Sequence, residues 1–302
     1  MKKNKPTFLR WFHSKKTKPL SAVNNVITIP LADHLSSEAA KRPHMEPQQL
    51  VYGCAQSVGK QRDHNEDSLF ALSLVMGGQE TSQPIGLFII ADGMGGHQYG
   101  EVASATATRT LAGYILKKLH PFLMNPTESP DEPLQELMRN AINEAQRAVT
   151  QAAPGSGTTL TVALVLGQQV TFGHVGDSRA YAIHPYGSGQ VLTRDHSLVK
   201  RLEELGQISS DEAATHPQRN VLYRALGQGD VLEPDIFTAP FPQFGTLLLC
   251  SDGLWSVITD SNLYETVVKS ANLQEAGQKL VTAANDAGGP DNISVILVQF
   301  VG

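Results

Sequence analysis

The order of strand-like and helix-like segments is the feature that most restricts what this 302-residue chain can fold into. From about residue 50, alternation and short apolar runs predict three strands, at Val51–Val58, Ser68–Leu74 and Leu87–Ala91. Two helical stretches follow together, at about Gly100–Leu119 and Pro133–Ala152, with a proline-bearing loop between them. A second block of strands then runs from "TTLTVALVLG" to "GQVLT", joined by short turns.

The last third of the chain is grouped in the same way. A polar, charge-rich segment of mixed helical character spans His196–Gly229, before the strand "TLLLCS". Two short helices are expected across Ser261–Ala287, and "ISVILVQF" reads as the final strand. Because strands and helices come in blocks, the pattern argues against a doubly wound parallel sheet. It favours an α+β domain of antiparallel sheets with helices packed outside.

Composition places the chain among soluble globular proteins, with 41% hydrophobic and 18% charged residues. No apolar run approaches the ~18 residues that span a bilayer. The two cysteines, Cys54 and Cys250, are far apart and belong to no CxxC or Cys/His cluster. This argues against a disulfide framework or structural zinc and predicts a reducing, cytoplasmic location.

Charge divides the chain into two parts. Residues 1–48 hold nine Lys/Arg and three Asp/Glu, a net of +6, so residues 49–302 carry −11. An acidic body is not the profile of a nucleic-acid-binding domain. The tail lacks the apolar core of a signal peptide. We expect a disordered extension over 1–48 and a folded domain over 49–302. A weak anchor to an acidic membrane surface, through Trp11 and Phe12 among the lysines, is the alternative for the tail.

Three short strings imitate known motifs and fail on spacing or context. "GCAQSVGKQ" has five residues between its glycine and the GK pair where a P-loop needs four, and Gln61 replaces the Ser or Thr. "GDSRA" around Ser178 lacks the second glycine and the helix of a nucleophile elbow. "GSGTT" runs into a strand, so it offers no helix N-terminus to a phosphate.

Carboxylates recur where predicted strands begin or end. A single Asp-Gly after a strand is most simply a turn. Repeated clusters are harder to explain in that way, because a sheet brings its strand ends together. The residues are Glu66 and Asp67 before "SLFALSL", Asp92 after "LFII", Asp177 in a hairpin turn, Asp252 after "TLLLC", and Asp291 before the last strand.

Convergence of these side chains would require the uptake of protons or the binding of cations. Four aspartates within about 5 Å of one another repel by roughly 3 kcal/mol per pair at an effective dielectric near 20. The sum, on the order of 20 kcal/mol, exceeds the ~5–15 kcal/mol stability of a typical domain. Two divalent ions would balance four ionised aspartates, and oxygen donors suit Mg²⁺ or Mn²⁺. The glycines after Asp92 would then let the backbone approach the metal that Asp92 holds.

At these residues the chain resembles the metal-dependent type 2C Ser/Thr protein phosphatases, in their bacterial form. The similar strings occur in family order between Gln49 and Gly302, outside the first 48 residues. They are "GKQRDHNEDS", "ADGMGGHQYGE", "GSGTTLTVAL", "GHVGDSRAY", "LTRDHSLV", "LGQISSDEA", "LYRALG", "CSDGLW" and "GGPDNISVILV". The resemblance implies an antiparallel β-sandwich flanked by helices, a four-layer αββα fold, with two metals at one end.

The resemblance also implies residue roles. Asp92 would bridge both metals. The Gly93 carbonyl would help bind one of them, and Asp252 with Asp291 would complete the other metal's shell. Glu66 and Asp67 would serve the second metal directly or through its waters. Bacterial members often bind a third, weaker metal, and Asp177 with Asp252 matches that site. Further roles are Arg62 as the phosphate-binding arginine, Asn292 as a group orienting Asp291, and Leu198 to Gly227 as the substrate flap.

The mechanism so implied is direct attack on phosphorus by a water that bridges the metals, with no phosphoenzyme. Many eukaryotic members have a histidine after "DG" as general acid; here Met94 stands there and cannot donate a proton, so a metal-bound water is the expected donor. His97 and His64 are expected to be structural or surface groups. Asp195–His196 is expected to support neighbouring loops.

The leading functional hypothesis is therefore a Mn²⁺/Mg²⁺-dependent phosphoprotein phosphatase acting on phosphoserine and phosphothreonine. The alternatives are a catalytically weak regulatory member that binds phosphoproteins, and a hydrolase of small phosphoesters. Expected partners are phosphoproteins made by a Ser/Thr kinase, with no nucleic acid, and the protein is expected to be a monomer.

Overall fold

The computed structural model describes residues 48–75, 83–95, 99–125, 130, 132–229 and 232–301. All of them belong to one unit of the chain, residues 44–302. His97 and the predicted extension, Gln48 apart, lie outside the described residues. The strands are β1 Gln49–Ser57, β2 Asp67–Leu74, β3 Ile85–Met94, β4 Gly157–Thr158, β5 Leu160–Leu166, β6 Gln169–Val175, β7 Arg179–Ile183, β8 Gly189–Val191, β9 Asp235–Pro240, β10 Thr246–Cys250 and β11 Ile293–Val301.

Helices fall into two pairs and three short segments. They are α2 Tyr99–Met124, α3 Leu134–Ala152, α4 Leu198–Glu204, α5 Ser210–Thr215, α6 Asp252–Trp255, α7 Asp260–Lys269 and α8 Leu273–Asp286. In the part of the chain that the structure describes, no helix is long and apolar enough to cross a membrane.

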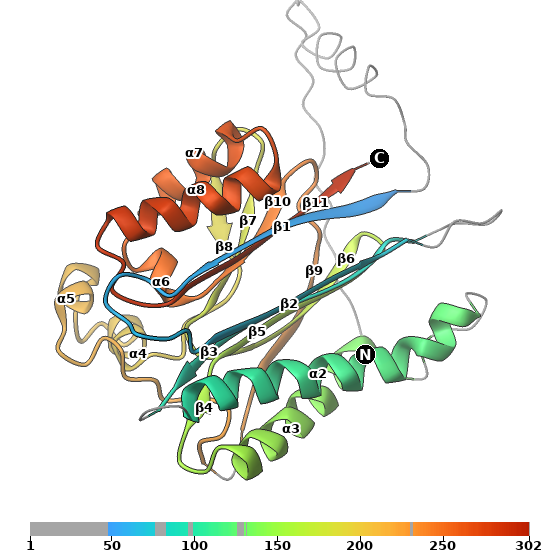
Figure 1. The fold of residues 1–302 in the computed structure, drawn as a ribbon, viewed down its shortest axis with the longest axis horizontal. Coiled ribbons are helices and arrows are strands. Elements are labelled where there is room, and N and C mark those ends of the chain that lie inside the picture. The colour runs from blue at the N-terminus through green and yellow to red at the C-terminus, as the bar shows by residue number, and fades with distance from the viewer. Residues whose placement is uncertain are drawn as a thin grey trace, which may run out of the picture. The chain divides into compact units, whose positions relative to one another are not determined.

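The strands form two antiparallel sheets that face each other (Figure 1). One has five strands in the order β1-β11-β10-β7-β8; the other has six, in the order β2-β3-β5-β6-β9, with β4 paired to β3. Helices α7 and α8 cover the outer face of the first sheet, and α2 and α3 cover the outer face of the second. The predicted α+β sandwich with outer helices is confirmed.

Strand β3 shows why the buried strands read as continuous apolar runs. Leu87, Ile89 and Ala91 point into the core beneath α2 and α3, whereas Phe88 and Ile90 point into the core between the sheets. Successive strand residues face opposite sides. A strand covered on both faces therefore needs apolar residues at every position.

Three elements differ from the sequence-based expectation, and one of them is the short helix α6, Asp252–Trp255, which was not predicted. Helix α2 continues five residues beyond Leu119 to Met124, through Pro121, because Leu123 packs into the core beneath α2. Strand β9 was missed because its sequence, "DIFTAP", is short and ends in proline. It is an edge strand, and an edge strand tolerates a proline that a central strand would not.

Candidate metal centre

The pairing of β2 with β3 sets two aspartates against each other. Asp67 begins β2, Asp92 lies near the end of β3, and the antiparallel register makes them direct partners. Side chains on directly opposed residues leave the sheet on the same face with Cβ atoms about 4.5–5.5 Å apart. The register therefore brings these two predicted metal ligands together at one end of the second sheet.

The other three aspartates reach this end from connections of the first sheet. Asp252 follows β10 at the start of α6, Asp291 precedes β11, and β10 and β11 are antiparallel neighbours. Asp177 lies in the turn from β6, in one sheet, to β7, in the other. Burial raises the pKa of Asp92 well above its ordinary value, and charge repulsion from the four other aspartates of the cluster raises it further. The predicted carboxylates thus form one electrostatic cluster.

Burial and mutual repulsion raise the pKa of several members. Desolvation, opposed by hydrogen bonds from two serines, raises the pKa of Asp67 to about 7, with Asp252 and Asp291 adding repulsion. Desolvation and Asp291 raise the pKa of Asp252 to about 6. Burial and the Asp252 charge raise the pKa of Asp177 well above its ordinary value. Such a cluster favours protons or cations over free carboxylates.

Two carboxylate oxygens have no protein partner. Asp67 Oδ2 accepts hydrogen bonds from the hydroxyls of Ser251 (2.8 Å) and Ser294 (2.6 Å). By contrast, Asp67 Oδ1 and Asp252 Oδ1 are buried without a hydrogen bond, two of only four such side-chain atoms among the described residues. A buried, unpaired carboxylate oxygen is costly unless a cation meets it. This donor set fits a hard divalent metal.

The carboxylates do not form a finished ligand shell. Within the described segments, no three His, Cys, Asp or Glu side chains stand at the spacing of a complete metal site. Asp291 Oδ2 instead accepts a 2.6 Å hydrogen bond from Arg62 Nη2. That ion pair raises the pKa of Arg62 against the opposing effect of burial, with Glu66 and Asp252 contributing further attraction. Arg62 therefore lies within electrostatic reach of the cluster.

Asn292 fixes the loop that carries Arg62 and Glu66. Its Nδ2 donates to the carbonyls of Val58 (2.8 Å) and His64 (2.9 Å), and its Oδ1 accepts from the Glu66 N–H (2.7 Å). Its own N–H donates to Asp291 Oδ1 at 2.8 Å. The predicted orienting contact to Asp291 is thus made by the backbone, while the buried side chain holds loop 58–66. His64, half-exposed, lies 3.4 Å from Glu66 Oε1.

Gly93 is enclosed by backbone. A Cβ there would lie 2.1 Å from the Gly100 carbonyl oxygen and 2.7 Å from that of Glu66. Gly93 N–H donates to the same Glu66 oxygen at 3.1 Å. Glycine is therefore required for α2 to begin against β3. Next to it, Met94 Sδ accepts a weak hydrogen bond from the Gln228 amide at 3.8 Å.

A hydroxyl pair joins Asp92 to the turn of Asp177. Thr159 Oγ1 accepts from the Asp92 N–H (2.9 Å) and lies 2.7 Å from Ser178 Oγ. Ser178 is fully buried in that contact. Its hydroxyl is therefore a structural link, and the rejection of a serine nucleophile agrees with its position.

Comparison with known proteins assigns the chain to the family that its carboxylate motifs resemble. A family model described as "Protein phosphatase 2C" matches residues 53–293. The chain belongs to the protein phosphatase 2C family. The serine/threonine phosphatase stp of Listeria monocytogenes is 38% identical over 247 residues, covering 80% of this chain and 92% of that protein.

Solved structures of serine/threonine phosphatases support the same family assignment. The serine/threonine phosphatase Stp1 of Staphylococcus aureus is 34% identical, with a TM-score of 0.68, and covers 84% of this chain and 96% of that one. The catalytic domain of the serine/threonine protein phosphatase PstP, crystallised with two manganese ions, is 30% identical with a TM-score of 0.67. The match covers 84% of this chain and all of that one.

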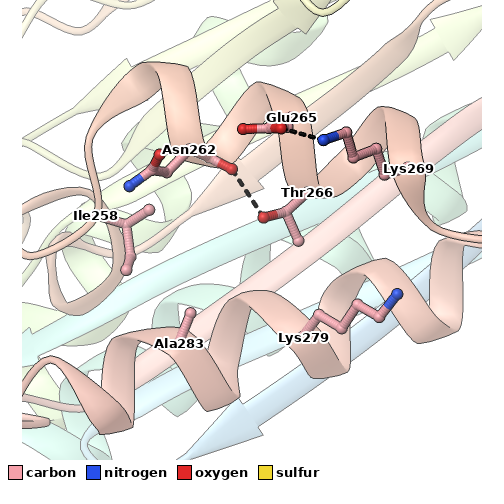
Figure 2. Close-up of a pocket in the computed structure, with 7 residues that line it drawn as sticks. All are labelled: Ile258, Asn262, Glu265, Thr266, Lys269, Lys279 and Ala283. Atoms are coloured by element: carbon pink, nitrogen blue, oxygen red, sulfur yellow. Dashed lines mark hydrogen bonds and ion pairs between the residues drawn. The ribbon is translucent and has the colours of Figure 1, made fainter.

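A cleft of about 450 Å³ lies between the carboxylate cluster and the predicted flap of this phosphatase 2C protein. Asp177, Asp252 and Trp255 line it from the sandwich, and α4 and α5 supply Lys200 and Ser210. A second hollow, of about 400 Å³, lies between α7 and α8 (Figure 2). It contains no predicted metal ligand, and Glu265 and Lys269 pair with each other on its rim. The first cleft is therefore the one that belongs to the site.

Sequence reasoning did not single out three buried hydroxyl residues of this phosphatase 2C site. Ser251 and Ser294 bind the Asp67 carboxylate, and Thr159 binds the Asp92 backbone. Ser251 precedes Asp252 and Ser294 follows Asn292 by two residues. Their closeness to predicted ligands was the available signal, but serine and threonine are common in turns and strands and give no specific pattern.

Proposed function

We propose that this protein is a metal-dependent serine/threonine protein phosphatase that hydrolyses phosphoserine and phosphothreonine. The observation that carries the proposal is the pair of buried, unpartnered oxygens on Asp67 and Asp252 inside a cluster of raised-pKa carboxylates. Family membership and the named activity of the bacterial relatives support it.

Two Mn²⁺ or Mg²⁺ ions are the proposed cofactors, as in the manganese complex of PstP. Asp92 would help to hold both, as the resemblance to the family implies, and it lies directly opposite Asp67 in the β2–β3 pair. Asp252 and Asp291 would hold one ion, and the Gly93 carbonyl with Asp67 and Glu66 would hold the other. Asp177 with Asp252 would hold a third ion. Bound metal supplies Lewis acidity toward the phosphoryl oxygens and the means to generate hydroxide near neutral pH.

Arg62 is proposed to bind the phosphate of the substrate. Its side chain is 47% exposed and sits on loop 58–66, which Asn292 ties to the cluster. A guanidinium donates two parallel hydrogen bonds to a phosphate and is always charged. Its present partner, Asp291, is itself a proposed metal ligand, so in the metal-loaded protein Arg62 would be available to bind the phosphate dianion. Met94 has no proton to donate, so the leaving serine or threonine oxygen must take its proton from water.

Phosphoproteins produced by a Ser/Thr kinase are the proposed substrates, which gives the protein a role in phosphorylation signalling in the cytoplasm. The flap, 198–227, forms one wall of the cleft and is proposed to select among them. We assign catalysis to residues 49–302 and expect the protein to act as a monomer. The basic residues 1–48 are assigned a docking or solvating role. Nucleic acid is not among the expected partners.

The test is phosphate release from a phosphothreonine peptide with Mn²⁺, with Mg²⁺ and with EDTA. Asp252→Asn is compared with Asp260→Asn, an exposed aspartate at the start of α7. We expect metal-dependent release by the wild type and the control, and a loss of at least about 100-fold in Asp252→Asn, since even groups behind a ligand cost 10–100-fold.

Other outcomes would contradict this function. Release that persists in EDTA would exclude a metal mechanism. Hydrolysis of p-nitrophenyl phosphate with no release from any phosphopeptide would point to a small-phosphoester hydrolase. Manganese binding by the wild type, seen by calorimetry, with no turnover of either substrate would leave a phosphoprotein-binding role.

A further inference from the structure

His196 is a buried histidine for which the proposed mechanism has no use. It is 1% exposed and stands immediately before Ser197, whose hydroxyl caps α4 at the start of the flap. Its ring lies between two regions that the reaction needs: the turn that carries Asp177, and the two ends of the flap. Each ring nitrogen faces one of these regions.

The Nδ1 side holds the Asp177 turn. Gly176 N–H lies 3.2 Å from His196 Nδ1, and His196 N–H donates to the Gly176 carbonyl at 2.7 Å. Gly176 has φ +104°, and a Cβ there would lie 2.6 Å from Thr159 Cγ2. Thr159 in turn binds the Asp92 N–H. The turn is thus clamped between His196 and the residue that holds Asp92.

The Nε2 side holds the flap. His196 Nε2 lies 3.2 Å from Asp235 Oδ2 at the start of edge strand β9. Asp235 also pairs with Arg224, at 3.2 Å. The His196 carbonyl accepts from Tyr223 N–H at 2.9 Å. Ser197 and Leu222 form a bridge beside it. Both ends of the flap therefore meet at this residue and at Asp235.

The hydrogen-bond partners assign the tautomer. Gly176 N–H can only donate, so Nδ1 must accept and the ring proton must sit on Nε2, facing the Asp235 carboxylate. Arg224 Nη1, 3.3 Å from Nε2, therefore serves Asp235 and not the ring. Burial, opposed by Asp235, lowers the pKa of His196, which agrees with a neutral ring.

We propose that His196 is a positioning residue with two separable halves. Through Nδ1 it fixes the Gly176–Asp177 turn and so sets the affinity of the metal site; through Nε2 it latches the flap to Asp235. The first half rests on the proposed metal-dependent function. The second half does not, because it concerns only how tightly residues 198–222 are held.

Two variants separate the halves. In His196→Asn, the amide oxygen can take the place of Nδ1 and keep the Gly176 bond, but nothing reaches Asp235. In His196→Gln, the amide nitrogen can take the place of Nε2 and keep the Asp235 bond, but the Gly176 N–H loses its acceptor. Asp235→Asn, at a half-exposed side chain, leaves at most a neutral hydrogen bond in place of the charge-assisted one, without touching the histidine.

Manganese binding by calorimetry and limited trypsin cleavage after Lys200 and Arg219 are the readouts. We expect His196→Gln to weaken Mn²⁺ binding about tenfold or more, the effect of losing a group that orients a ligand, with flap cleavage near the wild-type rate. We expect His196→Asn and Asp235→Asn to keep the Mn²⁺ affinity. Trypsin should cleave the flap of these two variants about tenfold faster, because each has lost one charge-assisted hydrogen bond that held the flap closed.

Equal Mn²⁺ affinity in His196→Gln and His196→Asn would overturn the first half, and unchanged cleavage in both latch variants would overturn the second. If the wild type binds no Mn²⁺, the proposed function falls together with the first half, while the cleavage result still decides the latch. Should His196→Gln fail to fold, hydrogen exchange in Asp235→Asn decides. Faster exchange at 198–222 with residues 176–178 still protected supports two halves, and joint loss of protection refutes them.

Discussion

Replacing Asp67 by asparagine tests whether the carboxylate cluster opposes folding when no metal is bound. The pKa of Asp67 is raised from 3.8 to about 7, first by desolvation. The folded, metal-free protein therefore binds this proton more tightly than the unfolded chain does. Stability contributed by the protonated carboxyl is fully present below pH 3.8 and is lost as the pH rises through about 7.

The magnitude follows from the pKa difference. At about 1.4 kcal/mol per pKa unit, a rise from 3.8 to about 7 corresponds to about 4 kcal/mol. This is a large part of the ~5–15 kcal/mol stability of a typical domain. Asparagine keeps an oxygen that can accept from Ser251 and Ser294 but does not ionise. It also removes the charge that, among the neighbouring carboxylates, contributes most to raising the pKa of Asp92.

The assay is urea unfolding followed by tryptophan fluorescence in EDTA, from pH 4 to pH 8. We expect the wild-type free energy of unfolding to fall across this range by about 4 kcal/mol more than that of Asp67→Asn. The two proteins should differ least near pH 4. Asp260→Asn, an exposed aspartate, should follow the wild type. Parallel curves for the wild type and Asp67→Asn would refute the assignment of a raised pKa to this buried carboxyl.

Three further substitutions test the parts around the carboxylates. Gly93→Ala should destabilise the protein by about 1–3 kcal/mol in thermal melts, because the added Cβ would lie 2.1 Å from a carbonyl oxygen. As a control, Gly113→Ala in α2, where a Cβ meets open space, should stabilise the protein slightly. Arg62→Ala should raise the KM for phosphopeptide without weakening Mn²⁺ binding, since Arg62 occupies the carboxylate of Asp291, a proposed metal ligand; weaker Mn²⁺ binding in calorimetry would contradict this. Asn292→Ala should lose about 2–3 kcal/mol of stability through three hydrogen bonds, and Asn292→Asp should not rescue it, because its carboxylate would face the Val58 and His64 carbonyl oxygens and add a buried negative charge.

The grouping of strands and helices into blocks predicted antiparallel sheets with helices outside, and the resemblance implied the sandwich. Strands β3 and β11 are covered by helices on one side and by the opposite sheet on the other, so their runs stand out. Edge strand β9 has one half-exposed face and a terminal proline, and its pattern does not differ from that of a loop. The end of α2 depends on Leu123 reaching the core, a tertiary contact that helix propensity does not contain.

The candidate site was predictable in composition but not in detail. Acidic residues at strand ends suggested convergence, yet the direct opposition of Asp67 and Asp92 depends on the register of β2 with β3. A shift of one residue would move one side chain to the other face. Ser251 and Ser294 reach Asp67 across 184 and 227 residues of chain, and the ring of His196 reaches Gly176 across 20. Such contacts leave no local pattern.

The two oxygens of Asp67 show how one carboxylate contributes both to the stability of the fold and to metal binding. Hydrogen bonds from Ser251 and Ser294 stabilise the ionised form at Oδ2, which opposes the desolvation of the carboxyl. The buried Oδ1 receives no such bond. A metal that contacts Oδ1 therefore replaces a missing interaction, and its binding free energy adds to the stability of the fold. At a free metal concentration of 100 times the dissociation constant, this contribution is about 2.7 kcal/mol. Chelation should therefore lower the melting temperature, and it should do so less in Asp67→Asn than in the wild type.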